Sequence, residues 1–405
     1  MTDAPHTGTE HIEPMNDRVT VLVLGGGVGG VVAATALRRR LPEPHRVMLV
    51  DREPDHLFAP SLLWLITGKR SARQITRPLD RLRRRGIEFV RGEIEHIDPS
   101  ERRVRIVAGG MAHDVACDHL VISLGADLAP ETVPGLAVAG FNIYTLAGAQ
   151  RLRDALLGLS GGGSVAVVTP PPPYKCPAAP YEAAMLILDA LRARGLGSTA
   201  RVDLFTAESG PMGVAGSEVS AAVRSMVEEH GVSYHPDHAV ASVDPAARRV
   251  TFANGVSAVF DVLGFVPPHR VSGVVARAGL AGDSGWVSVD PGTLQTAFPG
   301  VYAVGDVTGI PLTMGKPLPK AGVFAELEAK VVAQNIARAV TGKGRPTRYD
   351  GRGACFIEAG GGKAGFGKGN FYAEPVPTIR LHRPSYRWHL AKILFEQNWL
   401  RRRLR

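Results

Sequence analysis

A strand-like run that leads straight into a glycine-rich turn constrains this chain more than any other feature. Residues 19–24 are all β-branched or Leu, which is typical of a buried parallel strand. Gly25, Gly27 and Gly30 then fit the pattern G-x-G-x-x-G, and a helical segment begins near Val31. In such a unit the glycines permit the turn, let a pyrophosphate approach the backbone and let the helix pack on the strand. The helix N-terminus adds N–H donors and partial positive charge, so the run predicts a dinucleotide site.

An acidic residue closes the next strand-like run. Residues 47–50 form that run, and Asp51 and Arg52 follow it. A carboxylate at this place can accept hydrogen bonds from both ribose hydroxyls of a dinucleotide. We expect Asp51 and Arg52 to help bind the cofactor. A lone glycine match is weak, but the strand, the helix and the acid together argue against a simple glycine turn.

Two further motifs bear on which dinucleotide is bound. One strand-like run ends at Gly305-Asp306, and another ends in a segment that begins at Ser123 and contains Gly125. The first resembles the Asp that holds the ribityl chain in flavoproteins with two dinucleotide-binding domains. The second resembles the Thr/Ser-x-x-Gly motif of the same superfamily. The three motifs stand in the right order, and the resemblance implies FAD.

The remaining pattern predicts an α/β fold with two Rossmann-like, doubly wound domains. We expect an FAD-binding domain at 18–150 with 290–343, a second domain at 151–289, and a C-terminal region at 344–405 for redox cysteine, quinone and membrane attachment. Residues 1–17 are polar and predicted to be disordered. Strand-like runs lie at 19–24, 47–50, 87–90, 103–107, 119–124, 164–169, 202–205, 232–234 and 301–304, and helical segments at 31–40, 181–194, 216–229 and 323–341.

The second domain lacks a glycine turn of its own. The run 164–169 is followed by four prolines at 170–173 and then by Tyr174-Lys175-Cys176. Prolines cannot donate N–H groups to a pyrophosphate. The sequence therefore argues against an NADH-dependent reductase, and no C-x-x-C or C-x-x-x-x-C pair supports a disulfide reductase.

The chain has three cysteines, which are too few and too widely spaced for a secreted disulfide framework. We expect Cys117 to be a small buried hydrophobe. Cys176 precedes the helical segment 181–194, whose N-terminus is expected to lower the pKa of its thiol. Cys355 follows a glycine-rich stretch.

The segments around Cys176 and Cys355 resemble the two redox-cysteine blocks of sulfide:quinone oxidoreductases and of the flavoprotein subunit of flavocytochrome c sulfide dehydrogenases. The resembling segments are 58–64, 173–182, 319–326 and 354–358. The resemblance implies that hydrosulfide attacks a Cys176–Cys355 bridge by thiol–disulfide exchange, that sulfane sulfur or polysulfide forms, and that electrons pass through FAD to a membrane quinone. It also implies that Lys320 and Gly322 lie by the flavin and that Glu182 is an acid/base.

Three positions depart from the pattern of that family. Tyr144 and Gly148 stand where many members carry a third cysteine and a histidine, and Met212 stands where another histidine is expected. These departures leave the subtype of the family open.

The C-terminus is basic and aromatic. From Lys363 to the end, ten Lys/Arg stand against two acids, although the whole chain has a net charge of only +9. Residues 386–400 place apolar and aromatic side chains at helical spacing before a run of arginines, a composition typical of an interfacial helix. We expect a peripheral membrane protein, at the cytoplasmic face because no signal peptide is visible, with a quinone slot lined by Phe356, Phe371 and Tyr372.

Other functions fit parts of the sequence. The alternatives are a flavocytochrome c flavoprotein subunit, a type II NADH:quinone dehydrogenase, and a non-catalytic flavin redox sensor. No nucleic-acid motif accompanies the charge, the histidines show no metal-ligand spacing, and a homo-oligomer is left open.

Overall fold

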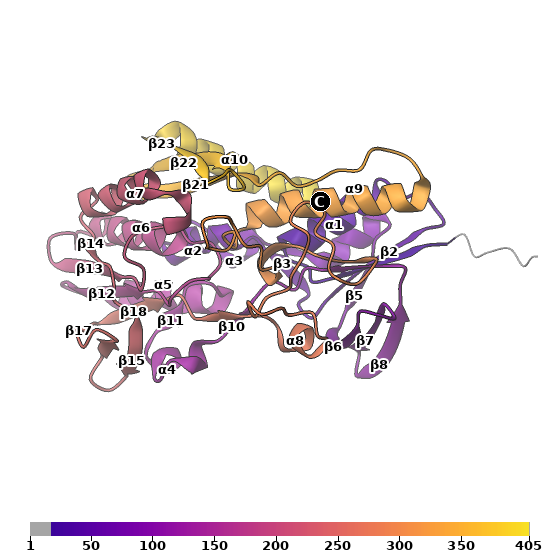
Figure 1. Ribbon diagram of the computed structural model, residues 1–405. Helices are drawn as coiled ribbons and strands as arrows, with labels where there is room; N and C mark the ends of the chain where they lie inside the picture. Colours follow the sequence, from indigo (N-terminus) through magenta and orange to yellow (C-terminus); the bar gives the residue numbers. More distant parts are fainter. Residues whose placement is uncertain (1–17, 405) are drawn as a thin grey trace, which may run out of the picture.

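The computed structural model describes residues 18–404, so the predicted disordered tail at 1–17 lies outside the described residues. Two α/β lobes lie side by side, and the C-terminal strands and last helix run along one edge above both (Figure 1). The predicted fold class, two Rossmann-like units in one chain, is confirmed by this architecture.

The first lobe is built on a parallel sheet with the order β20-β9-β1-β2-β5. Its strands are β1 (Thr20–Leu24), β2 (Arg46–Asp51), β5 (Glu88–Arg91), β9 (His119–Ile122) and β20 (Val301–Ala303). The runs are nearly all apolar because helices or an antiparallel meander cover both faces of the sheet.

Helices α1 (Val28–Arg38) and α9 (Gly322–Thr341) pack against each other on one face of this sheet. Every residue of α1 from Gly29 to Leu37 is buried, since the helix lies between sheet and α9. The other face is covered by the meander β6 (Glu93–Asp98), β7 (Arg103–Ala108) and β8 (Met111–Ala116), together with α8 (Gly273–Arg277).

The second lobe repeats the plan with a parallel sheet of order β11-β18-β12-β13-β14. The strands are β11 (Phe141–Asn142), β12 (Gly163–Val168), β13 (Ala200–Phe205), β14 (Ser233–His235) and β18 (Val262–Phe265). Its helices are α5 (Leu146–Gly158), α6 (Ala179–Ala193) and α7 (Ser217–Glu229), and a small antiparallel sheet holds β15 (Val240–Asp244), β16 (Arg249–Phe252) and β17 (Ser257–Val259). Most of α6 is buried because it carries apolar residues on nearly every side.

Short elements lie within and between the two lobes. They are β3 (Asp55–Leu57), α2 (Leu62–Ile66), α3 (Ala72–Ile75), β4 (Thr76–Pro78), β10 (Asp127–Leu128), α4 (Leu136–Ala139) and β19 (His269–Arg270), with 3₁₀ turns η1 (Ala59–Ser61), η2 (Leu79–Arg85), η3 (Pro130–Thr132), η4 (Gly213–Ala215) and η5 (Gly305–Val307).

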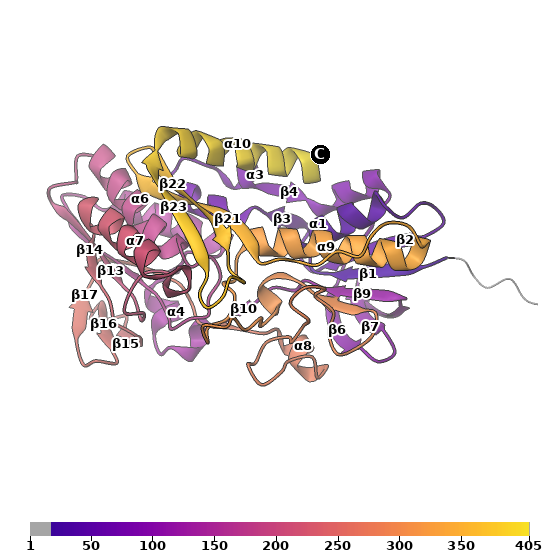
Figure 2. The same ribbon diagram turned by 45° about the horizontal axis from the view of Figure 1, so that its top comes forward.

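The C-terminal region forms an antiparallel sheet followed by a helix. The sheet contains β21 (Arg352–Gly360), β22 (Lys363–Asn370) and β23 (Thr378–Ser385), and Figure 2 shows it reaching from the second lobe to α9. Helix α10 (Tyr386–Arg403) begins where the Ser385 side chain accepts a hydrogen bond from Trp388 N. Its apolar residues Trp399, Leu400 and Leu404 enter the core of the first lobe. The tail helix is therefore docked along its length on the body of the protein.

In the described part of the chain, no helix is both long enough and apolar enough to cross a bilayer.

Candidate active site

The glycine turn has the sterics that a pyrophosphate cradle requires. Gly25 has a φ of +100°, and a Cβ at Gly30 would overlap the carbonyl oxygen of Gly25. A Cβ at Gly27, by contrast, would meet no atom within 4 Å, so the backbone there faces open space. Gly125, with a φ of +69°, also faces open space, at the end of the neighbouring strand β9. These residues fit the diphosphate of a dinucleotide.

Asp51 ends β2 beside this turn. Its carboxylate accepts hydrogen bonds from the backbone N–H groups of Gly26 and, over 2.7 Å, of Glu53, and burial raises its pKa. Arg52 points elsewhere, because its exposed guanidinium pairs at the surface with Glu53 and Glu93. The structure thus brings Asp51, but not the side chain of Arg52, to the glycine turn.

A buried carboxylate lies next to a buried ammonium at the end of β20. Asp306 Oδ1 has no hydrogen-bond partner within residues 18–404, and burial raises the pKa of this carboxyl group. Lys320 Nζ donates to the carbonyl oxygens of Asp306 (2.7 Å) and Thr308 (2.9 Å), and it lies 3.3 Å from the centre of the Trp286 ring. Burial lowers the pKa of Lys320 to about 8. An orphaned buried carboxylate oxygen is the acceptor that a ribityl hydroxyl of FAD would satisfy.

The proline loop places Cys176 against this lysine segment. Cys176 N donates to Lys320 O over 2.6 Å, and Tyr144 Oη donates to Cys176 O over 3.0 Å. These two bonds hold Cys176 in the left-handed region with a φ of +50°, which a residue with a side chain adopts only when its surroundings require it. Tyr144, which stands where many members of the resembling family carry another residue, thus helps to hold the backbone of Cys176.

Cys355 lies on β21 opposite Gly367, and both thiols line the same two cavities. The cavities have volumes of about 910 Å³ and 780 Å³, and Cys176 and Cys355 are among the residues at their shared boundary. The structure therefore places a cysteine of the second lobe and a cysteine of the C-terminal sheet on the lining of the same cavities.

The acidity of the thiols differs from expectation. Burial raises the pKa of Cys176 well above its ordinary value and that of Cys355 to about 11. The backbone N–H of Ala179, at the N-terminus of α6, does lower the pKa of Cys176, but desolvation and the nearby Glu182 carboxylate outweigh this effect. Lys392 lowers the pKa of both thiols, although by less than burial raises them.

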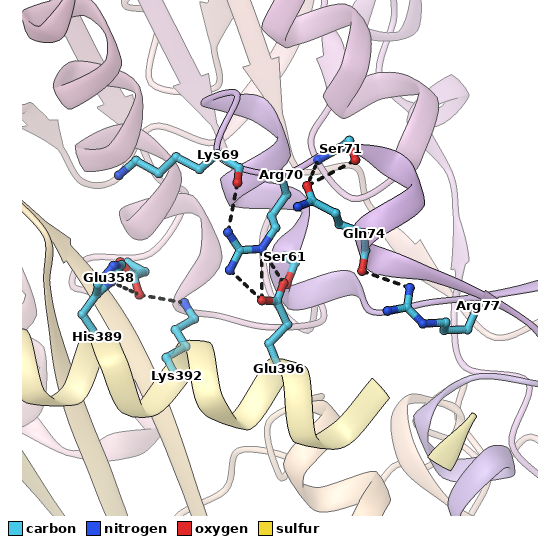
Figure 3. Close-up of polar contacts among 10 residues, drawn as sticks. All are labelled: Ser61, Lys69, Arg70, Ser71, Gln74, Arg77, Glu358, His389, Lys392 and Glu396. Atoms are coloured by element: carbon cyan, nitrogen blue, oxygen red, sulfur yellow. Dashed lines mark hydrogen bonds and ion pairs between the residues drawn. The ribbon is translucent and has the colours of Figure 1, made fainter. Parts of the chain in front are cut away.

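Glu182 belongs to a buried charge cluster that the sequence did not reveal. Its Oε1 accepts from Lys392 Nζ (2.8 Å) and from Glu358 N (2.7 Å). The Glu358 carboxylate lies 3.6 Å from the same ammonium and 2.9 Å from His389 Nδ1 (Figure 3). Glu182, Lys392 and both thiols line the larger cavity, so α10 contributes a cation to the cavity that holds the two thiols.

In the second lobe, the acid that follows β13 is bonded to a tyrosine of the proline loop. Tyr174, from the proline loop, is buried, and its hydroxyl donates over 2.8 Å to Glu208 Oε2, just after β13. A second Rossmann unit would present an acid to a ribose in this region. In this protein Tyr174, and not a ribose, donates the hydrogen bond to that acid, Glu208.

The two cavities differ in their lining. Aromatic side chains dominate the larger one: Phe58, Trp64, Phe356, Phe366, Phe395 and Trp399. Gly322, the first residue of α9, also lines it. The smaller one is lined by Lys320, Met212 and Phe371, among others. Tyr372 lines neither cavity, since its hydroxyl donates to Pro291 O over 3.1 Å. Of the three predicted quinone residues, the structure therefore brings only Phe356 to the larger cavity.

The glycine turn, the strand-end acids and the paired thiols define a two-lobed dinucleotide-binding oxidoreductase. Residues 19–325 match the model of the family described as pyridine nucleotide-disulphide oxidoreductase, so the chain belongs to that family. Together with the fit of the site, this makes the protein an FAD-dependent oxidoreductase.

The chain is similar to proteins named sulfide:quinone oxidoreductases. It is 29% identical over 399 residues to the sulfide-quinone reductase of Aquifex aeolicus, which covers 94% of this chain and 90% of that protein. It is 25% identical to the mitochondrial sulfide:quinone oxidoreductase of Mus musculus, covering 89% and 80%. The X-ray structure of the Aquifex aeolicus sulfide:quinone oxidoreductase superposes with a TM-score of 0.85 at 26% identity over 95% of this chain and 91% of that one. The resemblance that the sequence suggested is confirmed.

A relative with a different name is also similar. The NADH dehydrogenase-like protein of Mycobacterium tuberculosis is 30% identical over 302 residues, which cover 71% of this chain and 72% of that protein.

Proposed function

We propose that the protein oxidises sulfide to sulfane sulfur or polysulfide through Cys176 and Cys355 and passes the electrons through FAD to a membrane quinone. The observation that carries this proposal is that both thiols line the same cavities, next to the lysine segment of the FAD lobe. The named relatives and the matching solved structure support the same reaction.

The thiol chemistry is thiol–disulfide exchange. Hydrosulfide attacks one sulfur of a Cys176–Cys355 disulfide, so that a new S–S bond forms as the bond between the cysteines breaks. One cysteine becomes a persulfide and the other leaves as a thiolate. When a bond forms between the persulfide and that thiolate, the extra sulfur stays in the bridge and two electrons are released. FAD supplies the two-electron acceptor when it is bound.

Charged residues of the chain manage protons and anions during these steps. The Lys392 ammonium lies at the cavity with both thiols, where a positive charge favours the leaving thiolate. Glu182 is hydrogen-bonded to that ammonium and can take the proton that hydrosulfide or persulfide gives up. Lys320 would favour negative charge on reduced cofactor held beside Asp306.

The larger cavity fits an aromatic, apolar electron acceptor. Its lining is mostly apolar and includes Phe356, Phe366 and Phe395, which are suited to a quinone ring. Phe395 belongs to α10, whose outer face exposes Tyr386 (66%), Leu390 (56%) and Leu394 (50%). Such a face, flanked by arginines, is suited to the membrane interface, from which a quinone would enter.

Attachment at the cytoplasmic face of the membrane remains a prediction of the same proposal. Protease accessibility of the tail in inside-out and right-side-out vesicles tests it.

The direct experiment is anaerobic titration of the purified flavoprotein with sulfide while the flavin spectrum is recorded, followed by addition of a quinone analogue. Sulfide should bleach the flavin, and the quinone should restore its colour. A flavin that stays oxidised under excess sulfide would favour a flavin sensor over this enzyme.

An NADH dehydrogenase is the second candidate because of the relative from Mycobacterium tuberculosis. The Tyr174–Glu208 hydrogen bond and the prolines that replace the glycine turn count against it. NADH is expected to leave the flavin oxidised in the same cuvette, and rapid bleaching by NADH would revive that candidate.

A further inference from the structure

A third cavity lies outside the redox site, between the segment from Arg70 to Arg77 and helix α10. It has a volume of about 410 Å³. Its lining residues are Arg70, Gln74, Arg77, Ile393, Glu396, Gln397, Leu400 and Arg401. Figure 3 shows Arg70 reaching Glu396 of α10, with the Gln74 side chain bonded to Ser71 and Arg77 bonded to the backbone of Gln74.

The cavity carries more positive than negative charge. Its single carboxylate, Glu396, is fully engaged, because it accepts from Arg70 Nη2 (2.7 Å) and from Ser61 Oγ (2.5 Å). Within residues 18–404, no carboxylate forms an ion pair with Arg77 or Arg401. Three guanidinium groups against one carboxylate leave two uncompensated positive charges.

The guanidinium of Arg77 is held by hydrogen bonds from one of its nitrogens, and its other two nitrogens remain available to a ligand. Its Nη1 donates to the carbonyl oxygens of Arg73, Gln74 and Thr76. Across the described residues, Nε and Nη2 of Arg77 have no acceptor. Burial and the like charge of Arg81 lower the pKa of Arg77, Glu396 raises it in part, and Arg401 lowers it again, so a bound anion would relieve the remaining repulsion. A planar guanidinium with two free N–H groups matches the oxygens of a phosphate.

The position of the cavity on α10 indicates what kind of molecule carries the phosphate. Gln397 lies about one helical turn and Arg401 about two turns from Leu394, on the exposed face of α10. A ligand that reaches both the arginines and this apolar face must join an anionic phosphate to apolar chains.

We propose that the Arg77–Arg401 cavity binds the phosphate of an anionic phospholipid. The proposal rests on the membrane attachment of α10 put forward above. A head group held on this flank of α10 would fix how the helix is rolled on the membrane, since Phe395 and the larger cavity lie on its other flank.

The test compares two double variants of the full-length flavoprotein that lose the same charge. Arg77→Gln with Arg401→Gln removes the cavity arginines, and Arg73→Gln with Arg402→Gln removes two exposed arginines outside the cavity. Each charge near an anionic surface contributes about fivefold to binding, so both variants should bind phosphatidylglycerol-containing vesicles more weakly. The cavity variant should lose about a further tenfold, and equal losses would overturn the proposal.

A further double variant keeps both charges. It shows whether weaker binding comes from loss of the site geometry, and not from misfolding or from loss of total charge. Arg77→Lys with Arg401→Lys keeps both charges but removes the planar forks. It should lose about tenfold in binding to phosphatidylglycerol vesicles, with unchanged melting temperature and flavin content. Binding equal to that of the native protein would contradict the proposal.

Two further measurements distinguish a lipid phosphate from free phosphate, and distinguish the lipid site from the proposed sulfide reaction. If inorganic phosphate raises the melting temperature of the native protein but not of the cavity variant, while vesicle binding follows charge alone, the site takes free phosphate and the lipid assignment fails. Bleaching of the flavin by sulfide is measured without lipid on the same samples. Failure of bleaching would remove the proposed reaction and leave the lipid site standing.

Discussion

Lys392 of α10 donates a hydrogen bond of 2.8 Å to Glu182 of α6, although 210 residues separate them in the chain. The ammonium also lies 3.6 Å from Glu358 and shares the larger cavity with both thiols. The two sides of the tail helix therefore differ, since its inner side supplies a cation to the buried Glu182 and Glu358 while its outer side is exposed.

Replacing Lys392 by Met should both destabilise the protein and change its pH profile. Glu182 and Glu358 would stay buried without their cation, which costs about 3–5 kcal/mol in the free energy of unfolding. The thiol pKa values would rise further, so the rate of flavin reduction by sulfide should need a higher pH. Denaturant unfolding and stopped-flow rates measured across pH check both effects. Lys363→Met, at an exposed position, is the control and should change neither.

Replacing either Cys176 or Cys355 by Ser should abolish reduction of the flavin by sulfide, because a hydroxyl cannot form the sulfur bridge. Cys117→Ser is the matched control: Cys117 packs in the core of the first lobe, and it should keep the reaction at the cost of some stability. Anaerobic spectra of the three variants decide the point, and near-native bleaching in both active-site variants would rule the mechanism out.

The outer face of α10 can be tested without cutting the helix away. Truncation after Pro384 would also remove Lys392, Glu396 and Trp399, which are buried, so it should unfold part of the protein. The double substitution Leu390→Ser and Leu394→Ser should instead reduce vesicle binding and leave the melting temperature unchanged. Leu157→Ser, at an exposed site on α5, should leave both properties unchanged. Vesicle co-sedimentation that does not respond to the α10 change would refute attachment by this face.

The charge of Lys320 gives an alkaline limit to the reaction. Because burial lowers its pKa to about 8, the ammonium loses its proton as the pH rises through that value. The rate of flavin reduction should therefore fall above pH 8 in the native protein. In Lys320→Arg the guanidinium stays charged, so the fall should move to higher pH. If the rate falls over the same alkaline pH range in both proteins, a group other than Lys320 causes the fall.

The sequence predicted features that depend on local sterics and periodicity. Gly25 and Gly30 could be assigned because a Cβ would block a tight turn that follows a buried strand. The pairing of Cys176 with Cys355 could be predicted only through resemblance, since nothing local links two residues on different lobes.

Other features escaped prediction because their cause lies in tertiary contact. The glycines around Cys355 disfavour strands, yet β21 and β22 form there because close packing leaves no room for side chains: a Cβ at Gly353 would overlap the ring of Phe324. The sequence predicts an interfacial helix over residues 386–400, and nothing in that pattern shows that Lys392 and Glu396 are held by partners far away in the chain. Tyr174 satisfies Glu208 only because a loop folds over the end of β13.

The two thiols can be reached from separate chambers of the protein. In the proposed reaction, a small water-soluble nucleophile and an apolar, electrophilic oxidant would otherwise react directly with each other. Each reagent would have its own cavity, so electrons would pass from the sulfur pair through FAD to the oxidant without the two reagents meeting, and neither would have to leave before the other arrives.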